Sequence, residues 1–394
     1  MRLHLGMKTS ANRETVCACA LGRIFGYEPL CALRLVEALG SAAAVFDLTP
    51  SEADEVLGPF SKFKGMIRPQ AVDEAAEELE RLGELGCSYL PYTSPDFPAL
   101  LRECTDPPAG LYVRSVSPPD KIFGRSNAVG IVGTRDISPY GREWTRRLVK
   151  SMSECRHKPV IVSGLAFGVD ATAHTAALDC GLPTVAVLPV GIDDVYPKQH
   201  ARLAERIAGT EGCALVTDYP PGTGPVAFTF LRRNRIIAGL SNAVLITESK
   251  INGGGLITCR LAGEYGRDVF ALPGRIDDVR SAGCNALIGQ KEAEAVWSTS
   301  ALCDALGLGM WSKRTKEGLR ESILARFADR PEDEREALVS LAMRIKACRG
   351  ETLEELCRES NQDFGEVSRL ATMLEAEGFI GIDLLQRCTV CYKI

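Results

Sequence analysis

The chain has 394 residues, a formal net charge of −5, and 45% hydrophobic against 25% charged residues. This balance is typical of a folded globular protein and excludes a disordered or fibrous one, and the length predicts two or three domains. The sequence has no apolar run of about 18 residues and no signal-peptide core, so we expect a cytoplasmic protein. Because phosphate contacts depend on lysine and arginine, any nucleic-acid site in this acidic chain must be a local patch.

The 15 cysteines are scattered and often occupy apolar positions, such as Cys180, Cys213 and Cys259. In a chain of this size the pattern favours reduced, buried thiols over a disulfide framework. Cys388 and Cys391 form the single CxxC motif, which has neither a second CxxC nor a histidine pair beside it. We therefore predict no metal site.

Residues 1–85 are predicted to form a helical domain. Apolar residues recur there at helical spacing, namely Leu30, Leu33, Val36 and Leu39. Gly40 is placed to end that helix. The stretch 29–48 resembles the helix-hairpin-helix or SAM-like units of DNA-binding proteins, although plain helical packing explains it equally well.

Residues 86–300 are predicted to form a Rossmann-like α/β domain. Two short strands separated by a proline-rich turn lead into it over residues 88–113, after which apolar runs alternate with helical segments. The apolar runs are 128–132, 160–162, 184–188, 214–216, 243–246 and 268–272. Short apolar runs between helices are typical of a mostly parallel sheet, here of about six buried strands.

A charged and polar linker, 301–335, is predicted to precede a winged-helix-like domain at 336–394. The segment 352–380 shows a helix, a turn and a second helix. That second helix, predicted from Phe364 to Glu377, has three glutamates against a single arginine, Arg369. The charge favours contact with a protein over contact with duplex DNA.

The first strand of the α/β domain ends in a turn, Gly133-Thr134-Arg135, that leads into a helix. Glycine lets backbone N–H groups approach an anion closely, and a helix N-terminus adds positive potential. Arg135 can add a bidentate phosphate contact. The turn does not match the GxGxxG dinucleotide fingerprint, so a tight turn without a ligand is an equal alternative.

A second turn runs from Gly164 through Phe167 to Gly168. If both turns follow adjacent strands, their N–H groups converge on one crevice, where open α/β sheets bind ligands. Asp170 and His174 stand four residues apart on the helix that follows, and we favour a structural role for them over an acid/base pair.

The segment 228–235 combines aromatic residues with a run of basic and amide side chains. The predicted DNA contacts in it are Phe230, Arg232, Arg233, Asn234 and Arg235. Aromatic rings stack on unpaired bases, each stack contributing about 1–3 kcal/mol, while arginines hold phosphates, so the combination favours single strands. Helical spacing also allows some of these residues to cap the sheet or form salt bridges with it instead.

The loop 250–255 follows a further strand and ends in three glycines. We predict anion contacts from Lys250, Gly253 and Gly254, because glycines expose backbone donors. The alternative is a flexible loop that binds no ligand.

These motifs together resemble the DNA-processing protein A (DprA/Smf) family. The residues that carry the resemblance are Gly133-Thr134-Arg135, Ser138-Pro139-Tyr140-Gly141, Ser163-Gly164-Leu165-Ala166, Tyr196-Pro197, Tyr219-Pro220-Pro221-Gly222, Arg232 to Ser241 and Leu256-Ile257-Thr258. The resemblance is dense over 88–290. It implies single-stranded DNA binding at the two glycine turns, at Phe230 and at the arginines around Asn234. It also implies a homodimer formed through the Rossmann-like domain, loading of the RecA recombinase during natural transformation, and no enzymatic activity or cofactor.

Two positions depart from the family pattern. Phe167 stands where many relatives have a basic residue, and Gly253-Gly254-Gly255 stands where many have Ser-Gly-Ser. A base stacked on Phe167 would shift binding from charge towards stacking and lower its salt dependence.

Two other classes of function remain open. A nucleotide-cleaving enzyme of related fold would need a Pro-Gly-Gly-x-Gly-Thr loop followed by a catalytic glutamate, and only Glu248 and Glu264 stand nearby. A nucleotide sensor could use the same pocket for a mononucleotide. A dehydrogenase is disfavoured, because no acidic residue follows a GxGxxG strand at the distance needed for a ribose contact.

Overall fold

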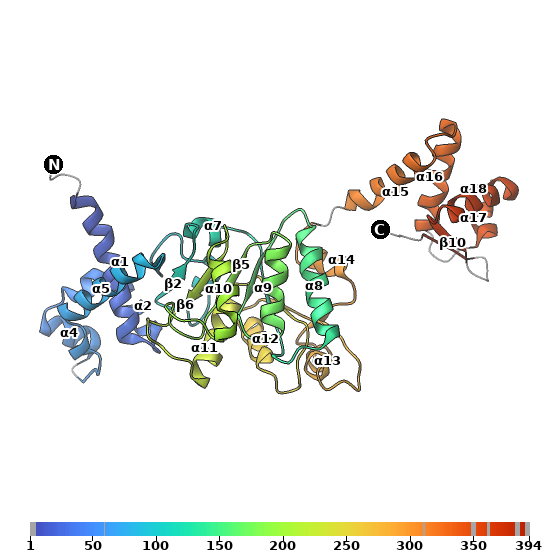
Figure 1. Ribbon diagram of the computed structural model, residues 1–394. Helices are drawn as coiled ribbons and strands as arrows, with labels where there is room; N and C mark the ends of the chain where they lie inside the picture. The colour runs from blue at the N-terminus through green and yellow to red at the C-terminus, as the bar shows by residue number, and fades with distance from the viewer. Residues whose placement is uncertain are drawn as a thin grey trace. The chain divides into compact units, whose positions relative to one another are not determined.

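The computed structural model describes residues 5–58, 60–309, 312–347, 352–360, 363–382 and 387–390. Backbone contacts divide the chain into two compact units, Met1–Met310 and Trp311–Ile394, which Figure 1 shows in blue to yellow-brown and in orange to red. None of the described helices is both long and apolar enough to cross a membrane. The predicted boundaries at residues 85, 300 and 335 remain predictions.

The N-terminal part of the first unit is helical, as predicted. Its helices are α1 (Leu5–Phe25), α2 (Pro29–Leu39), α3 (Ala42–Phe46), α4 (Pro50–Leu57) and α5 (Pro69–Glu84), with a 3-10 turn at Lys64–Met66. Helix α2 begins with a proline and ends at Gly40, whose φ of 81° is a left-handed value that favours glycine. The Glu14 carboxylate accepts hydrogen bonds from the backbone N–H groups of Ala42 and Ala43, which joins α1 to the start of α3.

The centre of the first unit is a nine-stranded sheet of order β1-β2-β6-β5-β4-β3-β7-β8-β9. The strands are β1 (Cys87–Pro91), β2 (Gly110–Arg114), β3 (Ala128–Val132), β4 (Val160–Ser163), β5 (Thr184–Val187), β6 (Ala214–Thr217), β7 (Ala243–Ile246), β8 (Asp268–Ala271) and β9 (Glu294–Ala295). The six predicted strands are confirmed as parallel neighbours. The two lead-in strands, β1 and β2, extend the sheet with antiparallel pairing, and β9 adds a short parallel edge.

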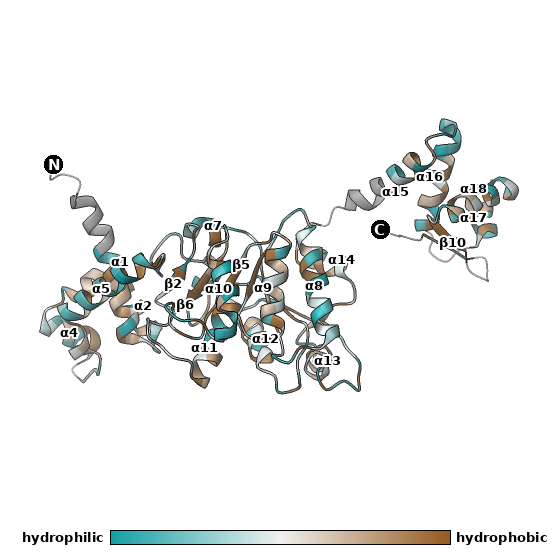
Figure 2. Ribbon diagram, in the orientation of Figure 1, coloured by the Kyte–Doolittle hydropathy of each residue, from teal (hydrophilic) through white to brown (hydrophobic). Residues whose placement is uncertain are grey.

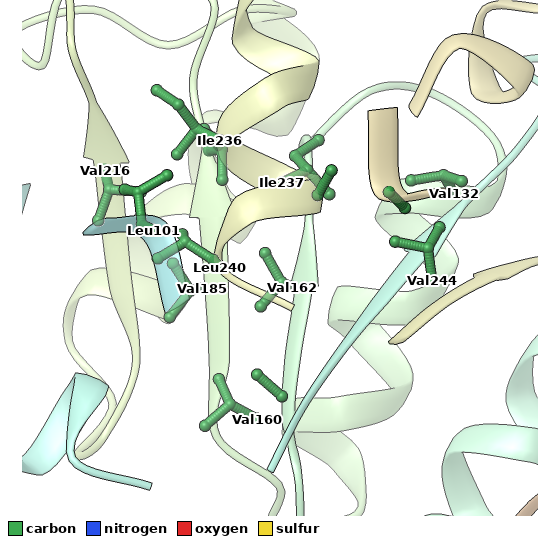
Figure 3. Packing of buried hydrophobic residues seen from close by; sticks show 14 of the residues in the cluster. Leu101, Val132, Val160, Val162, Val185, Val216, Ile236, Ile237, Leu240 and Val244 are labelled. Atoms are coloured by element: carbon green, nitrogen blue, oxygen red, sulfur yellow. The ribbon is translucent and has the colours of Figure 1, made fainter. Parts of the chain in front are cut away.

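Helices cover both faces of this sheet. One face carries α6 (Ala99–Arg102), α7 (Pro119–Phe123), α11 (Ala227–Gly239), α12 (Gly254–Glu264) and α13 (Ala282–Gly289). Figure 3 shows Ile236, Ile237 and Leu240 lying over the strand valines of this face. The other face packs against α8 (Pro139–Ser153), α9 (Val169–Asp179) and α14 (Thr299–Ala305), while α10 (Ala201–Ala208) joins the core that α1 and α5 share. Figure 2 accordingly shows hydrophobic strands between helices of mixed colour. The prediction of a Rossmann-like α/β fold is confirmed.

The strand order reverses at β3. The chain runs outward from β3 through β4, β5 and β6 on one side, then returns to place β7 and β8 on the other side. Helices that follow β3 and β7 therefore leave on opposite faces and open a crevice outside the carboxyl ends of these strands. This switch point is where open α/β sheets bind ligands.

The second unit contains α15 (Ser312–Arg326), α16 (Glu332–Ala347), α17 (Leu353–Ser360), α18 (Phe364–Ala376), and the antiparallel strands β10 (Ile380–Ile382) and β11 (Cys388–Val390). Its core includes Ile323, Leu338, Leu356 and Leu374. The predicted pair of helices in 352–380 corresponds to α17 and α18, whereas the winged-helix assignment remains a prediction. Cys391 of the CxxC motif lies outside the described residues, and no metal-binding cluster occurs among those that are described.

Candidate functional site

A cavity of about 580 Å³ opens at the carboxyl ends of the strands that flank the switch point. The turn after β3, the turn after β4, one side of α11 and the glycine loop before α12 contribute its walls. The residues that line it are Val132, Gly133, Thr134, Arg135, Asp136, Ala166, Asp170, Phe230, Leu231, Arg233, Asn234, Ile237, Lys250, Ile251, Asn252, Gly253, Gly254, Gly255, Thr258 and Val279. The convergence of turns that the sequence predicted is therefore present in the fold.

Nine of the fourteen predicted contact residues line this cavity: Gly133, Thr134, Arg135, Phe230, Arg233, Asn234, Lys250, Gly253 and Gly254. The other five, Gly164, Phe167, Gly168, Arg232 and Arg235, are not among the residues that line it. Sequence reasoning assigned no role to Asp136, Leu231 or Asn252, although each lies within two residues of a predicted contact. Whether such a neighbouring residue faces the cavity depends on how sharply each turn bends, and the sequence does not specify this.

An arginine and an aromatic ring lie face to face at the cavity. The Arg135 guanidinium lies 5.0 Å from the centre of the Phe230 ring. The Tyr196 ring also meets the Phe230 ring edge-on, at a centroid distance of 5.2 Å. Tyr196 belongs to a motif that the sequence analysis quoted without assigning it a role. The arrangement offers an aromatic surface and a cation within one short span.

The charge around the cavity is locally positive, in contrast to the net charge of the chain. Arg135 and Lys250 are both exposed, and within the described part of the chain neither forms an ion pair. The nearby carboxylate of Asp136 is already paired, since Arg280 donates to it at 3.0 Å. Gly254 and Gly255 begin α12, so the N-terminal end of the helix adds further positive potential at this wall. Two free cations and a helix N-terminus together suit a polyanion.

Arg233 is a buried member of the cavity wall. Its side chain is 4% exposed, and its Nη1 donates to the carbonyl oxygens of Gly164 and Val187, each at 2.6 Å. Burial lowers the pKa of Arg233 to about 10, which leaves it protonated at neutral pH. A Cβ at position 164 would overlap the guanidinium, so glycine is required there. Arg233 thus positions the turn after β4, between that turn and β5.

Asp170 holds the same turn from the other side. Its carboxylate accepts hydrogen bonds from the N–H groups of Gly164, at 3.1 Å, and Ala166, at 3.4 Å. Burial raises the pKa of Asp170, and the nearby charge of Arg233 opposes that rise. His174, one helical turn later, is completely buried with Nδ1 2.7 Å from the Thr184 hydroxyl, and burial lowers its pKa to about 3. Each residue has its own structural partner, so the geometry does not form an acid/base pair.

The predicted turn around Phe167 lies beside the cavity. Gly168 has a φ of 79°, and a Cβ there would overlap the backbone oxygen of Thr134, so the turns after β3 and β4 touch at this glycine. Phe167 is partly exposed and its ring meets His200 edge-on at 4.8 Å. The His200 Nδ1 lies 2.7 Å from the carbonyl oxygen of Leu165 in the same turn. The two rings form an aromatic edge next to the cavity.

The run of arginines on α11 divides between two surfaces. Arg235 is buried, forms an ion pair with Asp218 and donates to the carbonyl oxygen of Asp106. Arg232 donates to the carbonyl oxygen of Gly26 at 3.1 Å. With 3.6 residues per turn, the face that carries Phe230 and Arg233 looks into the cavity while these two arginines look away from it. Arg232 and Arg235 therefore lie outside the first cavity, and their predicted contacts with DNA remain a prediction.

The fold and the site define a Rossmann-like α/β protein with a cationic and aromatic cavity at its switch point. A family model for the DNA recombination-mediator protein A matches residues 88–307, which is more than half of the chain. The chain belongs to this family, and the resemblance predicted from its motifs is confirmed.

Relatives and solved structures agree with this assignment. The protein Smf of Synechocystis sp. is 37% identical over 298 residues, covering 75% of this chain and 74% of that protein. The X-ray structure of DNA processing protein A from Streptococcus pneumoniae matches with a TM-score of 0.62 and 30% identity, covering 74% of this chain and 97% of that one. A structure of DNA processing protein A from Helicobacter pylori, which reports its single-stranded DNA binding mode, matches with a TM-score of 0.50 and 29% identity over 56% of this chain and 95% of that one.

Proposed function

We propose that this protein binds single-stranded DNA in the switch-point cavity, in the cytoplasm, without catalysing a reaction on it. The observation that carries the proposal is the Arg135 guanidinium over the Phe230 ring, with the exposed Lys250 on the same cavity. An aromatic ring stacks on a base, and cations beside it neutralise phosphates. The Helicobacter pylori relative, whose structure concerns single-stranded DNA binding, supports this ligand.

Single strands fit this site better than a duplex. The cavity of about 580 Å³ has the size of a small-ligand pocket and offers few contacts to a rigid double helix. Bases in a duplex are stacked on one another, so none is free to lie on Phe230. The Gly253 N–H already donates to the carbonyl oxygen of Lys250, so Gly254 and Gly255 are the glycines whose backbone donors can contact phosphates, without reading sequence. We therefore expect binding that depends little on base sequence.

The placement of the nearby glutamates supports binding over nucleotide cleavage. Glu248 is buried, and its carboxylate accepts a hydrogen bond from the Ser138 N–H at 2.7 Å while its carbonyl accepts one from Thr134. It therefore shapes the turn after β3 and is not among the residues that line the cavity. Glu264 lies at the far end of α12, about 15 Å along the helix from its N-terminus. Of the two glutamates considered for catalysis, Glu248 is thus hydrogen-bonded to the turn after β3, and Glu264 is remote from the cavity wall at the start of α12.

Two finer parts of the proposal concern partners. We propose that the protein passes its bound strand to the RecA recombinase, as the family resemblance implies. We also propose a homodimer through the edge of the sheet at β8 and β9. Two exposed apolar side chains, Ile276 and Trp297, follow these two strands, and Ile276 is 99% exposed. Exposed apolar side chains that follow the edge strands of a sheet support an interface there.

Fluorescence anisotropy tests the DNA proposal directly. Labelled oligo-dT, the matching duplex and free nucleotides are titrated with the wild type and with the Arg135→Ala/Lys250→Ala double variant over a salt series. We expect the single strand to bind more tightly than the duplex, with affinity that falls as salt rises and falls further in the double variant. Tight binding of a nucleotide with none of oligo-dT would overturn the proposal in favour of a nucleotide sensor.

The partner proposals need separate measurements. Sedimentation of the wild type at micromolar concentration is expected to give a dimer mass, and Trp297→Lys is expected to give a monomer; a monomeric wild type contradicts the dimer. Addition of the protein is expected to shorten the lag of DNA-dependent ATP hydrolysis by RecA on oligo-dT. An unchanged lag contradicts the transfer of DNA to RecA.

A further inference from the structure

A second cavity, of about 450 Å³, lies on the opposite side of α11 from the first. It forms where the start of α2 meets the arginines of α11 that turn away from the switch point. The residues that line it are Tyr27, Glu28, Pro29, Leu30, Cys31, Arg34, Asp106, Arg232 and Arg235. We use the term Tyr27 surface for Tyr27, Arg34, Phe228 and Arg232.

Two aromatic rings of the Tyr27 surface lie against each other with much of their area in water. The rings of Tyr27 and Phe228 meet edge-on, with centroids 5.2 Å apart and planes at 78°. Tyr27 is 56% exposed and Phe228 is 53% exposed. The Arg232 guanidinium lies 4.9 Å from the centre of the Tyr27 ring. The combination of ring and guanidinium repeats that of Phe230 and Arg135 at the first cavity.

The charges of the second cavity leave a positive excess. Arg235 is neutralised by Asp218, with Asp106 also near it, and Glu28 is paired with Lys62 at 2.5 Å. Arg34 is exposed, and in the described part of the chain it has no ion pair. Arg232 contacts a carbonyl oxygen and a ring, neither of which carries a formal charge. Arg34 is thus exposed to phosphates, and Arg232 is half-buried with a charge that no ion pair in the described part of the chain neutralises.

The first turn of α11 connects the two surfaces. Phe230 and Leu231 line the first cavity, and Phe228 precedes them on the same helix. Phe228 and Leu231 are three residues apart, a rise of about 4.5 Å along the helix, and both are exposed. Leu231 on the first cavity and Phe228 against Tyr27 thus place two exposed apolar side chains, one helical turn apart, between the two surfaces.

We propose that single-stranded DNA longer than the first cavity can hold continues over the start of α11 onto the Tyr27 surface. There the rings of Tyr27 and Phe228 stack on bases, and Arg34 and Arg232 contact phosphates. This inference rests on the proposed function, because it extends the same strand. It makes the N-terminal helices part of the DNA interface and predicts that affinity depends on strand length.

Oligonucleotides of two lengths separate this inference from the proposed function. The Tyr27→Ala/Phe228→Ala variant is compared with the wild type by anisotropy on oligo-dT of about 6 and about 20 nucleotides. We expect the variant to bind the long strand about tenfold more weakly and the short strand with unchanged affinity. Val226→Ala is the matched control, since Val226 precedes the same helix and is 54% exposed but has no ring. Phe228→Trp is expected to retain wild-type affinity for both lengths.

The remaining outcomes each have a defined meaning. Unchanged affinity of the double variant for the long strand overturns the inference, while wild-type binding of oligo-dT still supports the proposed function. Equal weakening for both lengths also overturns it, because the mutations then act on the first cavity. Failure of the wild type to bind either length overturns the proposed function itself. As a second readout, Arg34→Gln is expected to reduce the salt slope by about 0.7 for the long strand only.

Discussion

The two ends of the parallel strands carry cavities of opposite character. At the carboxyl ends the cavity is about 580 Å³, and glycine turns, the exposed cations Arg135 and Lys250, and a helix N-terminus form its walls. At the amino ends a smaller cavity of about 210 Å³ lies between the strand starts and the short helices α6 and α7. Its lining is mostly aliphatic, as in Leu100, Ile122, Val160 and Val185, with Arg125 as its one charged residue among those described.

The difference follows from the direction of the strands. All parallel strands have their carboxyl ends on the same side of the sheet. The turns that follow them start helices, so N–H donors and positive helix ends come together on that side. On the other side, where the strands begin, helices end, and the loops that lead into the strands cover them with apolar side chains. The same sheet therefore has glycine turns and a helix N-terminus at the carboxyl ends of its strands and ordinary core packing at their amino ends. Four predictions test this contrast, from the largest expected effect to the smallest.

The buried arginine of the carboxyl-end cavity is expected to matter most. Arg233→Met leaves two carbonyl oxygens and the buried Asp170 carboxylate without their cation. We expect a loss of about 3–5 kcal/mol in the free energy of unfolding, measured by urea denaturation, together with a loss of DNA binding. Arg232→Met, at the neighbouring position, is expected to cost about 1 kcal/mol. Equal destabilisation by both substitutions would contradict the positioning role of Arg233.

The exposed arginine of the same cavity is expected to affect binding and not folding. Arg135→Ala removes a cation and the partner of the Phe230 ring, so affinity for oligo-dT is expected to fall by about 10- to 100-fold, or about 1–3 kcal/mol. The urea midpoint is expected to stay at the wild-type value, because the side chain is exposed. Arg142→Ala, an exposed arginine of α8 that does not line the cavity, is the control and should bind as the wild type does.

The buried histidine predicts a pH dependence of stability. Because burial lowers the pKa of His174 to about 3, the unfolded chain, with an ordinary value near 6.5, takes up this proton first as the pH falls. The stability is thus full above about pH 6.5, and this group removes about 1.5 kcal/mol of it between about pH 6.5 and pH 5. His174→Asn is expected to flatten this part of the pH profile of urea midpoints. A variant with the wild-type slope would contradict the assignment.

The amino-end cavity is expected to be the most tolerant. Val160→Ile adds one methylene to a space of about 210 Å³, so the free energy of unfolding is expected to change by less than about 1.5 kcal/mol. Affinity for oligo-dT should remain within about twofold of the wild type in the anisotropy assay. A large loss of affinity would show that packing at the amino ends of the strands affects DNA binding at their carboxyl ends.

Local physics explains how much of the fold the sequence predicted. Runs such as 128–132 and 243–246 are apolar at every position because parallel strands are buried on both faces, so six strands could be read directly. The antiparallel pairing of β1 with β2 and of β2 with β6 could not be predicted in this way. Cys87 pairs with Arg114 and Tyr112 pairs with Thr217, each across a long sequence separation. No local pattern encodes which edge of a sheet a strand joins.

The sequence by itself determined the kind of site: glycine turns after strands, aromatic residues beside arginines, and a family resemblance carried by motifs such as Gly133-Thr134-Arg135. Only the tertiary structure decided what each arginine does. Arg232, Arg233 and Arg235 stand within four residues of each other, yet one meets the Tyr27 ring, one holds the Gly164 turn and one pairs with Asp218. The reason is geometric, because a helix turns successive side chains by about 100° and long-range packing selects what each of them meets.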